Sequence, residues 1–467
     1  MIFSTFEFIF IFLPIVWASY FFLHHLNFHK AAKIFLVCSS FVFYAIGSRD
    51  FVLIFMASVT VNYAIGTALS KFPNSKKPFK IKILFFAGIL LNVALLGYYK
   101  YTDFFIQNWN FIFGTNLALK NIVLPIGISF FTFQLIAYLV DSWRGLTFGY
   151  SFLDYLLFIT FFPQLIVGPI VHHSEMVPQF ENPENQKINW DNIAKGLFVF
   201  SIGVAKKLLI ADPLTINAQS FFDSLKAVTG AANAWWYSIE YTISYYFDLS
   251  SYADMAIGIG LMFNILIPEN FNSPYKARNF QDYWQRWHMT LSRFLGAYIF
   301  RSVYKKGSKW RTYYAATMIT FFVSGFWHGA GWTFIVWGLI NGFFVCTASW
   351  MKKHEVSFPY IISRALTILG IILTRILFVS TSFSQSGTVF KSLVNFEGFK
   401  ITLGNGATKL ILARTLGAVI IIFFMPATKT LSDRFKPGVK TLIPLAFIIG
   451  LSVAFMGRTS SFLYFQF

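Results

Sequence analysis

The 467-residue chain has few charged residues and only two cysteines. Charged side chains make up 12% of it, well below the roughly 25% of a soluble domain, which excludes an ordinary soluble globular protein. Cys38 and Cys346 both lie in apolar runs, where we interpret them as small hydrophobic residues and not as a disulfide. No spaced set of cysteines and histidines indicates zinc or haem. We therefore expect no bound metal or cofactor.

Apolar residues dominate instead, at 56% of the chain, with a mean hydropathy of +0.59. A helix that spans a bilayer needs about 20 mostly apolar residues. Runs of this kind recur throughout: Phe6–Leu26, Ala31–Ile46, Phe51–Leu69, Ile83–Tyr99, Val123–Val140, Tyr155–Val171, Ile193–Ile210, Trp235–Phe263, Tyr313–Phe326, Trp332–Trp350, Ile361–Val379, Leu410–Phe424 and Leu442–Phe455. We predict an all-α polytopic membrane protein, a single domain over residues 1–467 with about 11–13 transmembrane or re-entrant helices.

Basic residues outnumber acidic ones, 38 to 19, and give a net charge of +19. The densest clusters, Lys71–Lys82 and Arg301–Arg311, lie between predicted spans. Basic loops of membrane proteins gather on the cytoplasmic side, near anionic lipid headgroups. We place both clusters there and expect a lipid membrane, not nucleic acid, as the partner.

Two segments interrupt the series of spans. Gly168–Asn192 is mostly polar, and Tyr246–Lys309 mixes carboxylates, aromatics and bases around Pro268 and Pro274. Prolines exclude one straight helix over the second segment. Broken backbone is tolerated in a membrane only where protein or a water-filled cavity satisfies it, so we predict a site near this segment.

His328 lies inside the apolar run Phe321–Cys346. An ionisable group at membrane depth is costly and usually functional, although a histidine hydrogen-bonded between helices is the alternative. A desolvated imidazole stays neutral and can accept a proton from a hydroxyl or thiol. Two glycine pairs at four-residue spacing, which favours close helix packing, flank it: Gly325 and Gly329, and Gly338 and Gly342.

A second histidine lies in Asp282–Phe300, which we predict to be helical. Helical spacing places one set of residues on a shared face: Trp284, Trp287, His288, Leu291 and Leu295. An interfacial amphipathic helix is the alternative interpretation. For His288 we favour a functional role because ionisable groups within the membrane are usually functional.

Two carboxylates, Asp248 and Asp254, lie six positions apart in an apolar stretch. They could orient a histidine or pair with an arginine such as Arg278, Arg286 or Arg293. We favour a structural ion pair, since such networks are common around buried carboxylates.

Tyr464 lies in the closing sequence SSFLYFQF. Such a tyrosine is often an interfacial aromatic residue. Its phenol, with a pKa of about 10, becomes a nucleophile only with the help of a base, and the two histidines could supply one.

Six ordered blocks carry a family resemblance: Leu124–Gly145, Phe162–Phe180, Phe247–Phe263, Pro268–Tyr275, Tyr283–Leu295 and Phe326–Gly338. Together they resemble the membrane-bound O-acyltransferases, in particular the bacterial branch that O-acetylates alginate or peptidoglycan or transfers D-alanine. The family core then covers residues 124–342. Two departures stand out: Ile376–Ser386 replaces a segment ending in Phe-Phe-Arg, and Arg301–Arg311 lacks a proline-glycine-glycine pattern.

The resemblance implies a fold around a central reaction chamber, with His328 as the catalytic residue and His288 as the chamber's second polar group. We expect four further residues to contact substrate: Trp327, Arg286, Asp254 and Asn272. Residues 456–467 resemble the tyrosine-containing motif of a small partner protein in the D-alanyl system. Tyr464 is then the expected acyl carrier.

The implied reaction moves an acetyl group from a cytoplasmic donor, acetyl-CoA, across the bacterial cytoplasmic (inner) membrane to an exported polysaccharide. Peptidoglycan and an alginate-like polymer both fit. A periplasmic SGNH-type acetyltransferase is the expected partner. Two alternatives are a transporter with a histidine proton relay, although its hydropathy pseudo-repeat is not visible, and a structural scaffold in which both histidines are replaceable.

Overall fold

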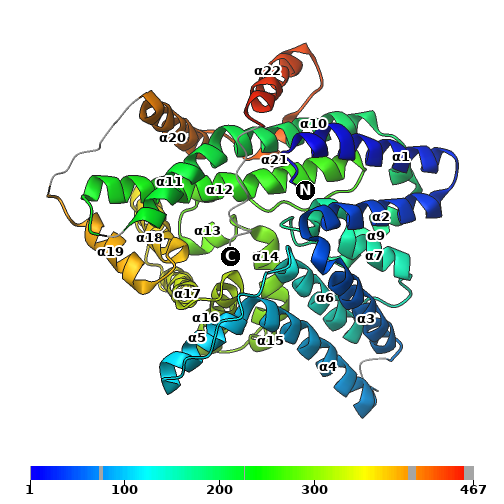
Figure 1. Cartoon of the computed structure of the whole chain (residues 1–467), viewed down its shortest axis with the longest axis horizontal. Helices are drawn as coiled ribbons and strands as arrows, with labels where there is room; N and C mark the ends of the chain where they lie inside the picture. Colours follow the sequence, from blue (N-terminus) through cyan, green and yellow to red (C-terminus); the bar gives the residue numbers. More distant parts are fainter. Residues whose placement is uncertain (1, 73–76, 226, 398–405, 457–467) are drawn as a thin grey trace. The chain divides into compact units, whose positions relative to one another are not determined.

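The computed structural model describes residues 2–72, 77–225, 227–397 and 406–456. Within these ranges every regular element is a helix, as predicted (Figure 1). The chain forms two compact units, Met1–Phe200 with Met255–Pro268, and Ser201–Asp254 with Glu269–Phe467. It passes from one unit to the other within α10 and again within α12.

The first unit is built mainly from the N-terminal helices. Their bounds are α1 Leu13–His25, α2 His29–Ser48, α3 Val52–Ser70, α4 Phe79–Leu96, α5 Thr102–Phe113, α6 Ile128–Trp143, α7 Phe152–Thr160, α8 Phe162–Leu165, α9 His173–Glu181 and α10 Trp190–Ala205. Helix α6 packs against α3 and α4, and α2 packs against α1 and α7.

The second unit contains the remaining helices. Their bounds are α11 Asp212–Ser224, α12 Ala231–Met262, α13 Phe280–Trp284, α14 Met289–Leu295, α15 Arg301–Val303, α16 Trp310–His328, α17 Trp332–Lys353, α18 Tyr360–Val379, α19 Phe383–Leu393, α20 Gly406–Phe424, α21 Thr428–Arg434 and α22 Val439–Phe455. Helix α17 packs against α16 on one side and against α18.

Glycines set the close approach of α16 and α17. A Cβ atom at Gly325 would collide with the backbone oxygen of Phe334, and one at Gly338 with the backbone oxygen of Phe321. Only residues without a side chain fit at this crossing, which confirms the packing predicted from the glycine spacing. The crossing fixes the C-terminal end of α16, where His328 lies.

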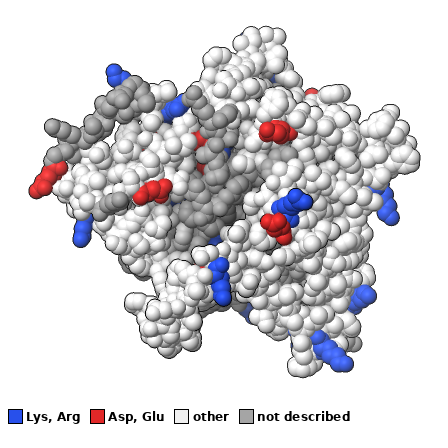
Figure 2. Space-filling model, in the orientation of Figure 1, with Lys and Arg blue, Asp and Glu red and all other residues white. Residues whose placement is uncertain are grey.

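Five described segments are long and apolar enough to cross a membrane: Phe8–His25, His29–Ser70, Phe79–Phe113, Trp332–Lys353 and Tyr360–Val379. The pair Lys409–Phe424 and Thr428–Arg434, bent by 65°, makes a sixth if it forms one span. Other predicted runs form shorter or more polar helices; Tyr155–Val171, for example, is divided between α7 and α8. Charged side chains are sparse on the face in Figure 2.

The predicted break in the central segment is confirmed. Helix α12 ends at Met262, and the chain then runs without an α-helix to α13, apart from a single 3₁₀ turn at Pro274–Lys276. Proline removes a backbone donor and fixes its own φ angle, so Pro268 and Pro274 favour this irregular path. The path carries Asn270 into the second unit, beside His288.

Candidate active site

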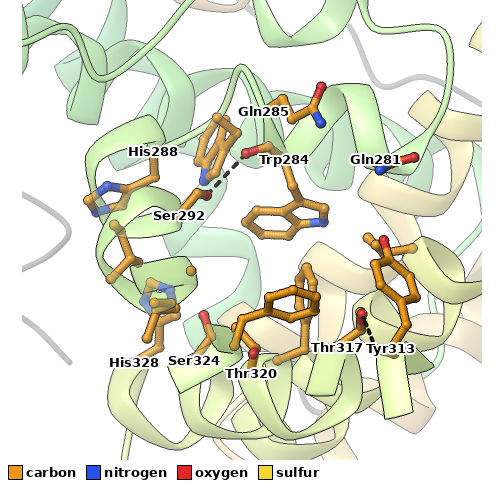
Figure 3. A pocket seen from close by; sticks show the side chains of 17 residues that line it. Gln281, Trp284, Gln285, His288, Ser292, Tyr313, Thr317, Thr320, Ser324 and His328 are labelled. Carbon is orange, nitrogen blue, oxygen red and sulfur yellow. Dashed lines mark hydrogen bonds between the residues drawn. The ribbon is translucent and has the colours of Figure 1, made fainter. Parts of the chain in front are cut away.

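A cavity of about 200 Å³ lies within the second unit (Figure 3). Its wall is formed by α13, α14, the π-helical segment Gly296–Phe300, α16 and α17. Both predicted histidines, His288 and His328, line it. Two segments that are 40 positions apart in the sequence therefore contribute their imidazoles to one cavity.

His328 is the last residue of α16 and is only 5% exposed. Its ring makes edge contacts with the rings of Trp337 and Phe378, whose centroids lie 5.2 and 5.3 Å away. The ring of Trp327 lies 4.8 Å from it. Aromatic side chains thus hold the imidazole at the cavity and keep it out of bulk water.

His288 adopts a left-handed backbone conformation, with φ 45° and ψ 53°. This conformation is uncommon for a residue other than glycine and costs about 1–3 kcal/mol unless its surroundings hold it. Here the Met289 amide donates to the Asn270 carbonyl oxygen at 2.9 Å. The prediction of one helix over Asp282–Phe300 is therefore wrong: α13 ends at Trp284, and α14 begins after His288. The residues predicted to share its apolar face nevertheless all line the cavity.

The buried Asn270 side chain determines the tautomer of His288. Its Oδ1 atom accepts from the Thr290 amide at 3.2 Å and from the Thr290 hydroxyl at 2.8 Å, and it lies 3.1 Å from His288 Nδ1. A carbonyl oxygen can only accept, so Nδ1 carries the proton and Nε2 carries the lone pair. His288 lies outside the helices that could span the membrane, and burial lowers its pKa to about 3. The ring is therefore neutral, with its unprotonated nitrogen at Nε2.

Replacing Asn270 with alanine is expected to lower acyl transfer by about 10²-fold, because a small misplacement of a catalytic group has this effect. The change removes the acceptor that holds His288 Nδ1 and the turn around it. Initial rates per folded protein, with folding checked by circular dichroism, measure the effect.

Asn341→Ala is the matched control for Asn270→Ala. Asn341 is equally buried, in α17, but it bonds to the backbone oxygen of Trp337 and does not line the cavity. We expect this change to lower stability without a comparable loss of rate. Equal loss of rate in the two variants would show that Asn270 does not act through His288.

Trp327, one of the expected substrate contacts, lies near both imidazoles. Its ring centroid is 4.8 Å from that of His328 and 6.5 Å from that of His288, both in edge-on geometry. It is not among the cavity-lining residues. In this structure it packs against both histidines.

Arg286 and Asn272 brace the loop around His288. Arg286 Nε donates to Asp282 at 2.6 Å, and the Asn272 amide donates to the Arg286 carbonyl oxygen at 2.9 Å. Neither residue lines the cavity. The neighbouring Asn270, which the sequence analysis did not select, holds the histidine instead.

Asp254 and Asp248 pair with adjacent lysines of the π-helical segment Lys206–Ala211. Lys206 Nζ lies 2.6 Å from Asp254, and Lys207 Nζ lies 2.6 Å from Asp248. The structural ion pair that we favoured is confirmed, with lysines as the partners. Tyr464 lies outside the described residues.

Arg375 is a buried residue near the site that the sequence analysis missed. It is 3% exposed, and its guanidinium carbon lies 4.3 Å from the Tyr245 ring centroid and 5.2 Å from that of Trp287. It directly precedes Ile376–Ser386, where the family pattern is lost. An arginine inside the apolar run Ile361–Val379 was the available signal, because charges in such runs are rarely tolerated without a role.

The helical membrane fold and the two-histidine cavity point to a membrane enzyme that transfers acyl groups. The chain belongs to the membrane-bound O-acyltransferase family, whose sequence model matches residues 75–384. The resemblance inferred from the six blocks is thus confirmed, and the protein is a multi-pass membrane acyltransferase.

Three relatives show where the chain lies within the family. It is 40% identical over 432 residues to the peptidoglycan O-acetyltransferase of Helicobacter pylori, covering 86% of this chain and 81% of that protein. It is 30% identical over 470 residues to the "Probable alginate O-acetylase AlgI" of Pseudomonas aeruginosa, covering 99% and 87%. It is 30% identical over 265 residues to the teichoic acid D-alanyltransferase of Bacillus subtilis, covering 54% and 66%.

Proposed function

We propose that this protein is an O-acetyltransferase of the bacterial inner membrane that moves acetyl groups from cytoplasmic acetyl-CoA toward an exported polysaccharide. The observation that carries the proposal is the meeting of two buried histidines, His288 and His328, in one cavity. The names of the relatives support the acetyl group and the polysaccharide acceptor, peptidoglycan or an alginate-like polymer.

His328 acts as the general base in the proposed reaction. It takes the proton from the acceptor hydroxyl, whose oxygen attacks the thioester carbonyl. The tetrahedral intermediate then collapses, the carbon–sulfur bond breaks, and the leaving thiolate recovers the proton from His328. The lone pair on His288 Nε2 suits proton acceptance, so we assign His288 to proton shuttling and not to donation toward the oxyanion.

The shape of the cavity supports an elongated donor. Residues of α16 that line it follow one face: Tyr313, Thr317, Thr320, Ser324 and His328. At the helical rise of 1.5 Å per residue, this stripe is about 22 Å long. A thioester on an extended arm can place its carbonyl at His328 while the arm lies along the stripe.

Exposed cations lie at the opposite end of α16 from His328. Five exposed basic residues, Arg301, Lys305, Lys306, Lys309 and Arg311, lie just before or within its first turn. Phosphate groups on a donor are attracted to such a cluster. This arrangement supports entry of acetyl-CoA from the predicted cytoplasmic side.

Delivery to the polysaccharide is assigned to a periplasmic SGNH-type acetyltransferase. In this scheme the partner holds the glycan outside the membrane. An acyl carrier must therefore connect the cavity with the acceptor. We assign this role to Tyr464, with acetylation of its phenol oxygen as the first transfer.

Purified protein in lipid vesicles, supplied with acetyl-CoA labelled in the acetyl group, tests the function. We expect labelled ester on the protein and, with the partner added, on peptidoglycan or alginate. A transporter would move substrate across the vesicle membrane without forming an ester. Absence of any labelled ester, with the donor intact, would rule out acetyl transfer from acetyl-CoA.

Tyr464→Phe is expected to abolish the label on the C-terminal peptide and to lower glycan acetylation at least about 10²-fold, since the nucleophilic oxygen is gone. Mass spectrometry of that peptide measures the first effect. If the wild-type peptide carries no label and Tyr464→Phe keeps full activity, Tyr464 is not the carrier, while the acetyltransferase function still stands.

A further inference from the structure

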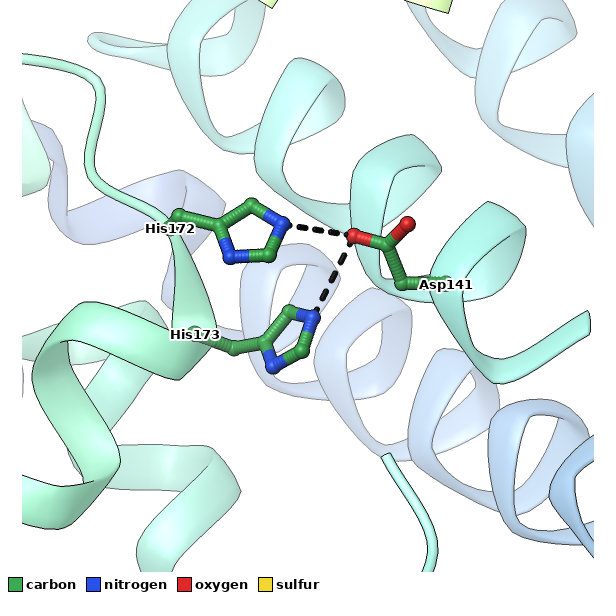
Figure 4. Close-up of side chains that lie close together, drawn as sticks. All are labelled: Asp141, His172 and His173. Carbon is green, nitrogen blue, oxygen red and sulfur yellow. Dashed lines mark hydrogen bonds and ion pairs between the residues drawn. The ribbon is translucent and has the colours of Figure 1, made fainter. Parts of the chain in front are cut away.

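Three potential metal ligands converge in the first unit (Figure 4). Asp141 lies near the end of α6, and His172 and His173 lie at the start of α9. The ligand atoms, Asp141 Oδ2 and the Nε2 atoms of both histidines, all lie within 4.8 Å of one another. We infer that these residues bind a divalent transition-metal ion of the zinc class.

Local structure aims the two imidazoles at one carboxylate oxygen. His172 is the N-terminal cap of α9, and the Glu175 side chain accepts from the His172 amide at 3.4 Å in return. The turn that this capping box forms directs both adjacent rings toward Asp141. Asp141 and His173 are 1% exposed, whereas the His172 side chain is 32% exposed and leaves a path for an ion.

The separations are close to those of a coordinated ion. Asp141 Oδ2 lies 2.8 Å from His172 Nε2 and 3.2 Å from His173 Nε2. Ligand atoms of tetrahedral zinc, with bonds of about 2.0–2.1 Å, are about 3.3 Å apart. The two separations from Asp141 therefore need to lengthen by at most about half an ångström, and the two Nε2 atoms lie within 4.8 Å of each other.

Each histidine has an outer partner for its second ring nitrogen. The Ser174 hydroxyl oxygen lies 2.6 Å from His172 Nδ1, and the Tyr150 hydroxyl oxygen lies 3.0 Å from His173 Nδ1. Metal-ligating histidines almost always have such a partner, which sets the tautomer and the ring orientation. The Ser174 and Tyr150 hydroxyl groups thus orient both rings for coordination of an ion.

Binding needs only a change of tautomer. Without the ion, each Nε2–H donates to Asp141, and the Ser174 amide donates to His172 Nδ1 at 3.3 Å. With the ion, each proton lies on Nδ1 and is donated to the Ser174 or Tyr150 hydroxyl oxygen, so neutral rings lose no proton overall. The Ser174 amide bond and the two Nε2–H hydrogen bonds to Asp141 are given up, and coordination of the ion by the same three ligand atoms replaces the latter two.

Arg144 limits the charge of the site. Its guanidinium lies 3.2 Å from Asp141 Oδ1, and its side chain is 46% exposed. The positive charge of Arg144 repels a bound cation, and water screens this repulsion in part. By holding Oδ1, Arg144 also leaves Oδ2 for the ion. Two imidazoles and one carboxylate suit zinc and neighbouring transition metals, and not Mg²⁺ or Ca²⁺, which prefer oxygen ligands throughout.

The ion would join the end of α6 to the start of α9. The chain between these two points is about 30 residues long and contains α7 and α8. An ion bound at both of its ends closes this loop in the folded protein and stabilises the folded state by mass action. The proposal replaces our expectation that the chain binds no metal. The sequence pattern does not reveal the site because Asp141 and the two histidines are distant in sequence.

Zinc titration of the whole protein tests the inference. The protein is purified with a tag other than polyhistidine, stripped with a chelator and titrated with Zn²⁺ against a competing indicator, and Co²⁺ is used to record a coordination spectrum. We expect one ion per chain, no competition by Mg²⁺, and a higher unfolding temperature with zinc. This readout does not depend on acyl transfer.

Three variants and one control decide the outcome. Asp141→Asn and His173→Gln should weaken zinc binding more than the about 10–100-fold typical of a lost outer partner, and Tyr150→Phe should weaken it about 10-fold. His25→Gln, at an exposed histidine of α1, should bind as wild type does. The inference is overturned if the wild-type protein shows no saturable zinc binding. It is also overturned if Asp141→Asn and Tyr150→Phe, which keep the side-chain shapes, both bind zinc as tightly as the wild-type protein does.

Discussion

Replacing His328 with alanine is expected to lower acetyl transfer by about 10²–10⁴-fold, the usual contribution of a positioned general base. His328 contacts the cavity from the last turn of α16, among the rings of Trp327, Trp337 and Phe378. In the variant, a water molecule that took over as the base would have to enter the space between these aromatic rings. Labelled-acetyl transfer by membranes containing each protein measures the change.

The control for His328→Ala is His354→Ala, at an exposed histidine that directly follows α17 in the same unit. It should retain the wild-type rate. Both proteins should elute from size exclusion as wild type does, so that loss of folding is separated from loss of catalysis. A folded His328→Ala protein that still acetylates glycan at the wild-type rate would refute the general-base assignment.

Replacing Lys207 with methionine is expected to lower the free energy of unfolding by about 3–5 kcal/mol, the usual cost of removing one partner from a buried ion pair. Its ammonium lies 2.7 Å from Asp212 and 2.6 Å from Asp248, and all three side chains are at most 3% exposed. The change leaves two buried carboxylates without their cation. The shift in thermal unfolding of the detergent-solubilised protein measures the cost.

Two further variants test whether charge is the cause. Adding Asp212→Asn and Asp248→Asn to Lys207→Met should restore most of the lost stability, since no buried charge is then left uncompensated. Lys187→Met removes an ion pair with Glu184 of the same length, 2.7 Å, but with both side chains about 70% exposed. It should change stability by less than about 1 kcal/mol. An equal loss at Lys187 and Lys207 would contradict the argument from burial.

The helical fold could be predicted because apolar runs leave few structural choices. In lipid every backbone amide needs a partner within the protein, and a helix supplies one locally. The glycine spacing at Gly325 and Gly338 predicted the crossing of α16 and α17 for a similar reason, since close approach depends on the absence of a side chain. His328 could be selected because its cost in an apolar run depends on sequence alone.

The environment of His288 could not be predicted in the same way. Helical spacing assigned it to a continuous helix, but Asn270 holds it in a left-handed turn from 18 positions away. Local patterns carry no information about such a partner. Arg375 could have been selected from its place in an apolar run, but its packing against the rings of Tyr245 and Trp287 could not be predicted, because those rings belong to other segments.

The sequence by itself determined that this chain is a helical membrane protein, which family it belongs to, and that His328 and His288 are the residues to examine. Those conclusions rest on composition, local periodicity and ordered motifs. Only the tertiary structure decided that the two histidines share one cavity, that Asn270 leaves the lone pair of His288 on Nε2, and that Asp141 meets His172 and His173. Each of these depends on contacts between distant segments, whose geometry arises from packing and not from the order of residues along the chain.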